Sequence, residues 1–288
     1  MIPAPFEYQA PTSLADALQQ LEQARAAGKD VKVLGGGQSL LPVLRLRMAA
    51  PEVLVDLSRI DELKGVRDDG DALVIGAMTT HDAVAHDALV REHALLLSVT
   101  SQQVADPQVR HRGTFGGSLV HADPAGDLPA PALALDAQMV IAGRGGQRRT
   151  VAAADFFTDL FTTAVADGEV LVEVRIPKYT GWGASYQKFN RVAQAWSIVA
   201  VAAAIRTDGG TIAEARIGLT NMGAIPVRAR AVEQALVGQP ATAEAIKAAS
   251  AAAGADTDPP SDSNADAHYR RHLAGVLTGR AVLAATAS

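Results

Sequence analysis

Two short glycine clusters contain the residues best suited to binding a ligand. The first, Gly35 to Ser39, reads Gly-Gly-Gly-Gln-Ser and directly follows an expected strand at 31–34. Without side chains, successive backbone N–H groups can point into one concavity that suits a phosphate, and the Ser39 hydroxyl adds a donor. A glycine run after a strand is also typical of a plain turn, so this cluster alone leaves both interpretations open.

The second cluster, Thr114 to Ser118, again places two adjacent glycines beside hydroxyl residues. A dinucleotide that bridges both clusters would use the amides of both, whereas two unrelated turns have no common reason for this composition. Neither cluster is a Walker A sequence or a Rossmann fingerprint. The pair therefore favours a diphosphate ligand, and it requires the two clusters to meet in space.

Carboxylates and histidines near the second cluster offer further chemistry. Asp123 and Asp127 can accept hydrogen bonds from ribose-like or ribityl hydroxyls, or can cap turns. His81 lies at an expected helix start, and His111 lies between two arginines that disfavour its protonation. We therefore assign no acid–base role to these histidines.

His268 and His272 have the spacing to share one face of a helix and could bind a metal ion. No carboxylate or third ligand accompanies them, which leaves the coordination shell open. The sequence predicts no metal site.

Composition limits the class of protein. The 288 residues correspond to about two domains, and a net charge of −5 without long basic blocks argues against nucleic acids and anionic membranes as partners. The chain has no Cys, so it cannot supply thiolate ligands to an iron–sulfur cluster, and any redox role needs an organic cofactor or another chain. The start lacks a secretory pattern and the longest apolar stretch, 196–205, is far too short for a membrane span, so we expect a cytoplasmic protein.

Hydrophobic periodicity indicates the elements that position these residues. Helices are expected at 13–28, 79–104, 228–236, 241–252 and 265–285, and strands at 31–34, 53–57, 63–66, 72–76, 137–142, 149–151, 169–176, 185–190, 198–206 and 211–219. The segment 105–131 has no sustained periodicity and is expected to be a functional loop system. The segment 177–183 is a candidate domain boundary, and 256–264 is a predicted loop between the last two helices.

At this point the motifs resemble a known family. Gly35 to Pro42, Ile75 to Thr80 and above all Asp106 to Asp127 are similar to the FAD-binding medium subunits of molybdenum hydroxylases, and among these most similar to the medium subunits of aerobic carbon monoxide dehydrogenases. Further similar segments are Lys188 to Arg191, Gly218 to Asn221, Tyr269 to Arg271 and Leu273 to Arg280. The resemblance covers nearly the whole chain.

The resemblance implies an α+β fold with two domains. Residues 1–177 would form a two-lobed FAD-binding domain of the vanillyl-alcohol-oxidase/p-cresol-methylhydroxylase type, with subdomains at about 1–57 and 58–177. Residues 178–288 would form a smaller C-terminal domain of the CO dehydrogenase flavoprotein type, with a three-stranded antiparallel sheet and helices.

The resemblance also implies positions for the cofactor contacts. The two glycine clusters would hold the pyrophosphate, Asp127 the ribityl chain and Val104 the adenine side, while Leu171 and Lys188 would lie near the flavin ring. Trp196 either covers the flavin face or is a core aromatic at a strand start. The complete expected set is Leu34, Gly35, Gly36, Gly37, Gln38, Ser39, Leu40, Val104, Gly113, Thr114, Phe115, Gly116, Gly117, Ser118, Asp123, Asp127, Leu171, Lys188 and Trp196.

Three positions depart from the pattern of similar proteins: Phe115 replaces the usual Ile, Ser118 the usual Asn, and Trp196 a Tyr. The implied function is an electron-transfer subunit of an oxidoreductase complex, a heterohexamer built as a dimer of heterotrimers. Its FAD would take electrons from iron–sulfur clusters of a small subunit and pass them to an acceptor such as quinone, while a large molybdopterin subunit oxidises the substrate.

Carbon monoxide, N-heterocycles, nicotine, purines and aldehydes all remain open as that substrate. A stand-alone flavin oxidoreductase and a non-catalytic assembly module without cofactor are the rival hypotheses.

Overall fold

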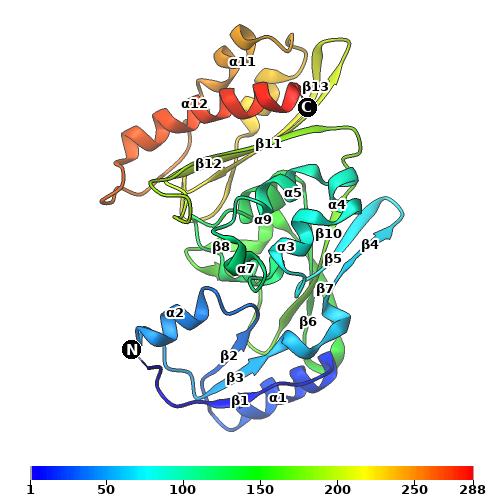
Figure 1. Cartoon of the computed structure of the whole chain (residues 1–288), viewed down its shortest axis with the longest axis vertical. Coiled ribbons are helices and arrows are strands. Elements are labelled where there is room, and N and C mark those ends of the chain that lie inside the picture. Colours follow the sequence, from blue (N-terminus) through cyan, green and yellow to red (C-terminus); the bar gives the residue numbers. More distant parts are fainter. Residues whose placement is uncertain (1, 288) are drawn as a thin grey trace.

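Three β-sheets are stacked along the long axis of the molecule (Figure 1). The computed structural model describes residues 2–287. The sheets have three, five and four strands, in the orders β1-β3-β2, β4-β5-β10-β6-β7 and β11-β12-β13-β14, and a two-stranded ribbon β8-β9 accompanies them. The predicted α+β class is confirmed. The sheet expected to have three strands has a short fourth one, β14.

The first sheet brings the first glycine cluster to its edge. Its elements are β1 (Glu7–Gln9), α1 (Leu14–Ala26), β2 (Val31–Leu34), α2 (Leu40–Arg45) and β3 (Val53–Asp56). Both outer strands pair with β3 in parallel. Helix α1 begins where the Ser13 hydroxyl accepts from the Asp16 amide at 3.1 Å, and it buries Leu14, Leu18 and Leu21. Because β2 stops at Leu34, the glycine cluster leaves the sheet edge directly.

The second sheet is antiparallel, with β10 at its centre. Its strands are β4 (Val66–Asp69), β5 (Ala72–Gly76), β6 (Gln138–Ala142), β7 (Arg148–Ala152) and β10 (Val170–Pro177). The expected hairpins β4–β5 and β6–β7 are confirmed. In the first of them the strand begins three residues later than predicted, at Val66 instead of 63.

The long helix predicted at 79–104 is wrong. The chain forms three short helices, α3 (His81–His86), α4 (Ala88–His93) and α5 (Leu95–Ser101). Asp87 has an extended backbone, and its carboxylate accepts from the amides of Leu89 and Val90 at 2.9 and 3.1 Å, which starts a new helix. This local cap competes with continuation of α3.

The loop system predicted at 105–131 contains three short helices, α6 (Pro107–Arg110), α7 (Phe115–His121) and α8 (Pro129–Ala134). Each has four to seven residues, too few for a periodic pattern. The second glycine cluster therefore lies at a helix start, with Thr114 as the N-cap of α7.

The third sheet separates two hydrophobic cores. It consists of β11 (Gly183–Phe189), β12 (Val199–Asp208), β13 (Thr211–Thr220) and β14 (Val227–Arg228), and it is accompanied by α10 (Arg230–Leu236), α11 (Ala243–Ser250) and α12 (Ala267–Thr286). The antiparallel order and the three helices were predicted, and both are confirmed. Ala200, Ala202 and Ala204 pack into the core that surrounds the second sheet. The alternate β12 residues join the core under α10 to α12.

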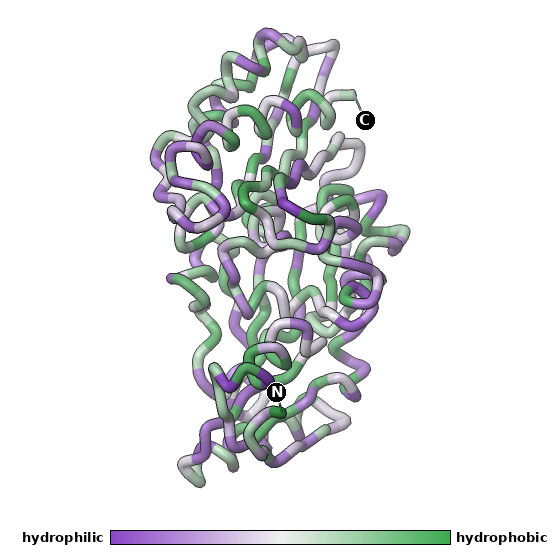
Figure 2. The backbone as a smooth tube through the Cα atoms, turned by 60° about the vertical axis from the view of Figure 1, so that its left-hand side comes forward, coloured by the Kyte–Doolittle hydropathy of each residue, from purple (hydrophilic) through white to green (hydrophobic). Residues whose placement is uncertain are grey.

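Several small elements escaped prediction: β1, α2, β14, α9 (Ala153–Phe156), β8 (Phe157–Asp159), β9 (Thr162–Thr163) and the 3-10 helices η1 (Leu57–Arg59), η2 (Asp61–Leu63) and η3 (Arg144–Gly146). Figure 2 shows hydrophobic segments running through the interior and hydrophilic segments at outer turns. No helix within residues 2–287 combines the length and apolar character that a bilayer span requires.

Candidate functional site

The two glycine clusters meet in space, as the sequence analysis required. A Cβ built on Gly36 would lie 2.0 Å from the carbonyl oxygen of Arg112 and 2.6 Å from the Cα of Gly113. A Cβ on Gly35 would lie 3.0 Å from Thr114 Oγ1. The backbones of the two clusters are therefore in direct contact, and glycine at position 36 is required by that contact.

Local structure fixes the second cluster against the end of β5. Thr114 forms an isolated antiparallel bridge with Thr80, and the amides of Phe115 and Gly116 donate to the carbonyls of Thr79 and Ala77 at 2.9 and 2.8 Å. A Cβ on Gly116 would lie 2.5 Å from Ala77 Cβ, so this glycine lets α7 pack on the strand end.

The amides of the two clusters differ in their partners. Those of Gly35, Gly36, Gly37, Gln38 and Ser39 have no protein acceptor within residues 2–287. The amides of Phe115, Gly116, Gly117 and Ser118 all donate to protein oxygens, the last two to Thr114 Oγ1 at 3.2 Å and Thr114 O at 3.0 Å. The expectation that both sets of amides face a ligand is thus wrong for the second cluster, because the start of α7 uses them.

The first cluster is open on its outer side. Gly37 has φ of +77°, a left-handed conformation that glycine adopts without strain. Gln38 is exposed, and its side-chain amide donates to Gly36 O at 3.3 Å. Ser39 is half-buried and its hydroxyl makes no cap hydrogen bond to α2, which leaves that hydroxyl available.

Several predicted contact residues lie in the interior. Phe115 is fully buried in the core, Leu171 is buried in β10, and Leu34 is buried at the end of β2. Val104 is half-buried, and its carbonyl accepts from Arg110 at 2.9 Å. Phe115 therefore contributes to the site by packing in the core.

His81 contacts the second cluster at Gly113. It is 4% exposed, its amide donates to Gly113 O at 3.0 Å, and a Cβ on Gly113 would lie 2.7 Å from the imidazole Cδ2. Burial, with a smaller contribution from Arg110, lowers the pKa of His81 to about 4. The ring is neutral at pH 7 and packs against Gly113.

Asp127 and Lys188, both predicted cofactor contacts, form a buried ion pair. Lys188 Nζ lies 2.9 Å from Asp127 Oδ2, and both side chains are 5% exposed. Asp127 Oδ1 accepts from Tyr186 at 2.7 Å and from Ser197 at 3.0 Å. Burial, followed by the charge of Asp127, raises the pKa of Tyr186, which keeps its proton for this bond. One lone pair of Oδ2 remains for a further donor such as a hydroxyl.

Sequence reasoning missed Tyr186. It lies two positions before Lys188 on β11, so the two side chains are on the same face of the strand. This two-residue spacing could have identified Tyr186 from the sequence.

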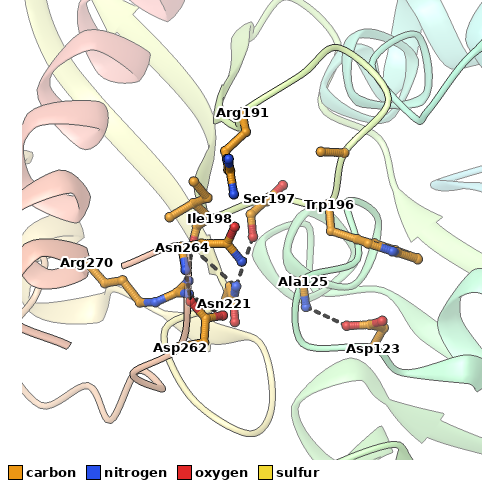
Figure 3. Close-up of a pocket in the computed structure, with 11 residues that line it drawn as sticks. Asp123, Ala125, Arg191, Trp196, Ser197, Ile198, Asn221, Asp262, Asn264 and Arg270 are labelled. Carbon is orange, nitrogen blue, oxygen red and sulfur yellow. Dashed lines mark hydrogen bonds and ion pairs between the residues drawn. The ribbon is translucent and has the colours of Figure 1, made fainter. Parts of the chain in front are cut away.

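Trp196 is not a core aromatic at a strand start. Strand β12 begins at Val199, and Trp196 is 55% exposed on the connection between β11 and β12. It borders a cavity of about 360 Å³, together with Asp123, Ala125, Arg191, Ala195, Ser197, Ile198, Asn221, Asp262, Asn264 and Arg270 (Figure 3). Asp123 caps its own turn by accepting from the Ala125 amide at 2.9 Å, which is the turn alternative considered for it.

Of the remaining histidines, His86 and His111 both lie near the Asp82 carboxylate, at 3.4 and 3.6 Å. His268 and His272 are both on α12, where the imidazole of His272 stacks on Tyr269. In the described part of the chain no three His, Cys, Asp or Glu side chains gather in a way that could hold a metal ion.

Comparisons with known proteins agree over the whole length of the chain. Residues 4–179 match the family model for the FAD binding domain in molybdopterin dehydrogenase, and residues 184–285 match the CO dehydrogenase flavoprotein C-terminal domain. The carbon monoxide dehydrogenase medium chain of Hydrogenophaga pseudoflava is 41% identical over 290 residues, covering 100% of this chain and 99% of that protein.

Solved structures give the same result. A chain of the carbon monoxide dehydrogenase structure from Hydrogenophaga pseudoflava superposes with a TM-score of 0.94 at 43% identity, covering 100% of this chain and 99% of that one. A chain of quinoline 2-oxidoreductase from Pseudomonas putida 86 superposes with a TM-score of 0.93 at 33% identity, with the same coverage. With its contacting glycine clusters and these full-length matches, the chain belongs to the family of FAD-binding medium subunits typified by those of carbon monoxide dehydrogenase.

Proposed function

We propose that this chain binds the diphosphate of FAD at the first glycine cluster and works as the electron-transfer subunit of a carbon monoxide dehydrogenase. The observation that carries the proposal is the row of amides at Gly35 to Ser39 without protein acceptors, lying beside the second cluster. Unpartnered backbone N–H groups in a concave turn suit phosphate oxygens. The residues present thus fit the cofactor that the family binds.

The two clusters have different roles in this proposal. The amides of residues 35–39 and the Ser39 hydroxyl bind the diphosphate. The second cluster supports them as a rigid surface through its contact with Gly36, and offers the half-buried Ser118 hydroxyl and the exposed Gly117 backbone to the ligand. Ligand binding at preformed amides avoids the entropic cost of ordering a loop.

The remaining predicted contacts are proposed on the same basis. Asp127 receives a ribityl hydroxyl on its free lone pair, Lys188 and Leu171 lie toward the flavin ring, Val104 toward the adenine, and Trp196 covers the flavin face. When bound, FAD would supply the chemistry of accepting electrons one at a time from iron–sulfur clusters and passing them on to the acceptor. The protein residues bind the cofactor, exclude water and set the local charge, and none is assigned as a nucleophile or general base.

The oxidation of the substrate is assigned to partner subunits. Since the chain has no Cys, the iron–sulfur clusters belong to a partner subunit. We assign the clusters to a small subunit and the molybdopterin to a large one. We propose a dimer of heterotrimers in the cytoplasm, with an acceptor such as quinone. Carbon monoxide is favoured as substrate because the CO dehydrogenase chain is 43% identical, against 33% for the quinoline enzyme.

A medium subunit for another substrate is the second candidate. It is supported by the TM-score of 0.93 to the quinoline 2-oxidoreductase chain, which shows that one flavoprotein fold accompanies different substrates. We also propose that the chain divides into residues 1–177, with subdomains at about 1–57 and 58–177, and residues 178–288. This division is supported by the end of β10 at Pro177 and the start of β11 at Gly183.

The test compares Ser39→Asp with Ser39→Asn in the complex purified with its partner subunits. The carboxylate would face the diphosphate beside the free amides, so FAD affinity falls at least about tenfold, whereas the neutral isostere retains it. Flavin absorbance per polypeptide and FAD titration of the cofactor-stripped complex measure the effect. Equal affinity of the two variants would show that no diphosphate lies at Ser39.

A further inference from the structure

The connection between β11 and β12, residues 190–198, is held mainly at its C-terminal end, and we name it the Trp196 loop. Its base is closed by the Ile198 amide, which donates to Phe189 O at 2.8 Å. Within it, the Asn190 side chain and the Ala195 amide both donate to Val192 O. The cavity of about 360 Å³ lies against its inner side. The loop therefore has little apolar packing beneath it, and its position depends on polar contacts at residues 197 and 198.

The first of these contacts comes from Asn221 at the end of β13. Its side-chain amide donates to Ser197 O at 2.9 Å and to Ile198 O at 3.2 Å. Asn221 has φ of +61°, and its own amide donates to Pro124 O at 2.8 Å. One residue thus ties the loop to the turn that follows α7.

The second contact comes from Arg270 on α12. Its guanidinium donates to Ile198 O through Nη1, and Nη2 lies 2.8 Å from Asp262 Oδ2 (Figure 3). Arg270 is 0% exposed, and its Nε has no partner among residues 2–287. Burying a guanidinium is costly, and apolar packing of α12 would not need one. Two contacts distinguish Arg270 from an apolar side chain, the ion pair with Asp262 and the hydrogen bond to Ile198 O, and the second of them reaches the loop.

The third contact joins the loop to the cofactor side of the molecule. The Ser197 hydroxyl donates to Asp127 Oδ1 at 3.0 Å, and Asp127 in turn pairs with Lys188. Trp196 precedes this pinned residue directly. Its backbone is therefore fixed on one side while its indole stays 55% exposed, as expected of a ring that covers a ligand instead of filling a core.

We infer that Arg270 and Asn221 are positioning residues that hold the Trp196 loop over the bound flavin and so set how fast FAD is released. The inference rests on the proposed function, because it places the flavin beneath Trp196. Arg270 and Asn221 contact the loop at the backbone carbonyls of Ser197 and Ile198. Both act through the backbone of residues 197 and 198.

The test is a double-mutant cycle on FAD dissociation from the intact complex. Arg270→Met removes a buried charge-assisted hydrogen bond and speeds release about tenfold, and Arg270→Lys, which keeps one donor, restores part of the slow rate. Arg271→Met is the matched control, because Arg271 donates from the same helix to Thr257 O and does not reach the loop. Asn221→Gly provides a second variant, since glycine accepts the left-handed φ while the amide is lost.

In a Trp196→Ala background, Arg270→Met should change the release rate less than about twofold, because both substitutions remove the same cover. Additive effects of the two substitutions would overturn the inference, and so would equal acceleration by Arg271→Met. Failure of the proposed function gives a different result, in which Ser39→Asp releases FAD at the same rate as Ser39→Asn.

Discussion

Gly36 and Gly113 lie where any side chain would collide with other protein atoms. The absence of a side chain at these positions therefore allows the two clusters to be in contact. A Cβ at Gly113 would lie 2.9 Å from the imidazole Nε2 of His81. In the proposed function, the ligand binds the amides of the first cluster, which have no protein acceptor within residues 2–287. These glycines are therefore explained first by the close approach of two backbone segments, and the proposed binding site depends on that approach.

His81 makes the stability of this contact dependent on pH. Its folded-state pKa of about 4 lies below the ordinary value of 6.5, so the unfolded chain binds the proton more readily. The contribution is fully present above pH 6.5 and is lost as the pH falls toward 4, by roughly 3 kcal/mol in total. His81→Gln, which does not titrate there, should flatten the fall of unfolding free energy between pH 7 and pH 4.

The matched control is His86→Gln, on the same short helix but with its side chain 57% exposed. It should keep the wild-type pH profile in denaturant titrations. If His81→Gln also keeps that profile, the imidazole does not titrate with a depressed pKa.

Local residue types predicted that the two glycine clusters meet in space, and they did not predict the long-range partners of Asp127. Glycine beside hydroxyl residues indicated both clusters because the chemistry lies in consecutive residues. The partners of Asp127 are 59 to 70 positions away, and no local pattern specifies which donors will fill a carboxylate. The use of the second cluster's amides by α7 was likewise invisible, since it depends on carbonyls of residues 77 and 79.

Among the elements, the short helices around the second cluster determine its geometry. The apolar spacing at 79–104 is continuous and predicted one helix, but the Asp87 cap and the non-helical Ala94 divide it into three. Apolar periodicity measures which face is buried, and it does not detect a break when the following helix continues the burial. Long elements such as α1, α12 and β12 were predicted because their patterns persist over several turns or alternations.

Thr114 is the cap that converts the second cluster into a helix start. Removing its hydroxyl in Thr114→Ala costs about 1 kcal/mol of stability and loosens the start of α7, beside which Gly35 of the first cluster lies. We expect weaker FAD binding together with the lower unfolding temperature, measured by FAD titration and thermal unfolding.

Thr242→Ala removes the corresponding cap of α11, where Thr242 Oγ1 accepts from Ala245 at 3.4 Å. It should lower stability comparably and leave FAD affinity unchanged. Loss of affinity in this control would mean that FAD binding follows general stability and not the cap of α7.

In the whole molecule, Asp127 joins the segment after α7 to the third sheet. Tyr186, Lys188 and Ser197 all donate to it from β11 or the Trp196 loop. Asp127→Ala leaves the Lys188 charge buried and unpaired, so it should destabilise the protein by about 3 kcal/mol. Denaturant unfolding of the complex measures the change.

The matched control is Asp68→Ala, which breaks an ion pair with Lys178 at the surface, with the Asp68 side chain 46% exposed. Solvent screens that pair, so the unfolding midpoint should stay near the wild-type value. Equal effects of the two substitutions would show that burial adds nothing to the Asp127 pair.

The alternation along β12 has a consequence for dissecting the chain. Ala200, Ala202 and Ala204 belong to one core, and Val199, Val201 and Ile205 to the other, so a single strand forms part of both interiors. In a truncated polypeptide ending at residue 179, the core around the second sheet would be exposed to water. The complementary fragment would expose the apolar face of β12 that normally packs on this core. Each piece expressed alone should aggregate, while co-expression of the two should yield a soluble, nicked protein.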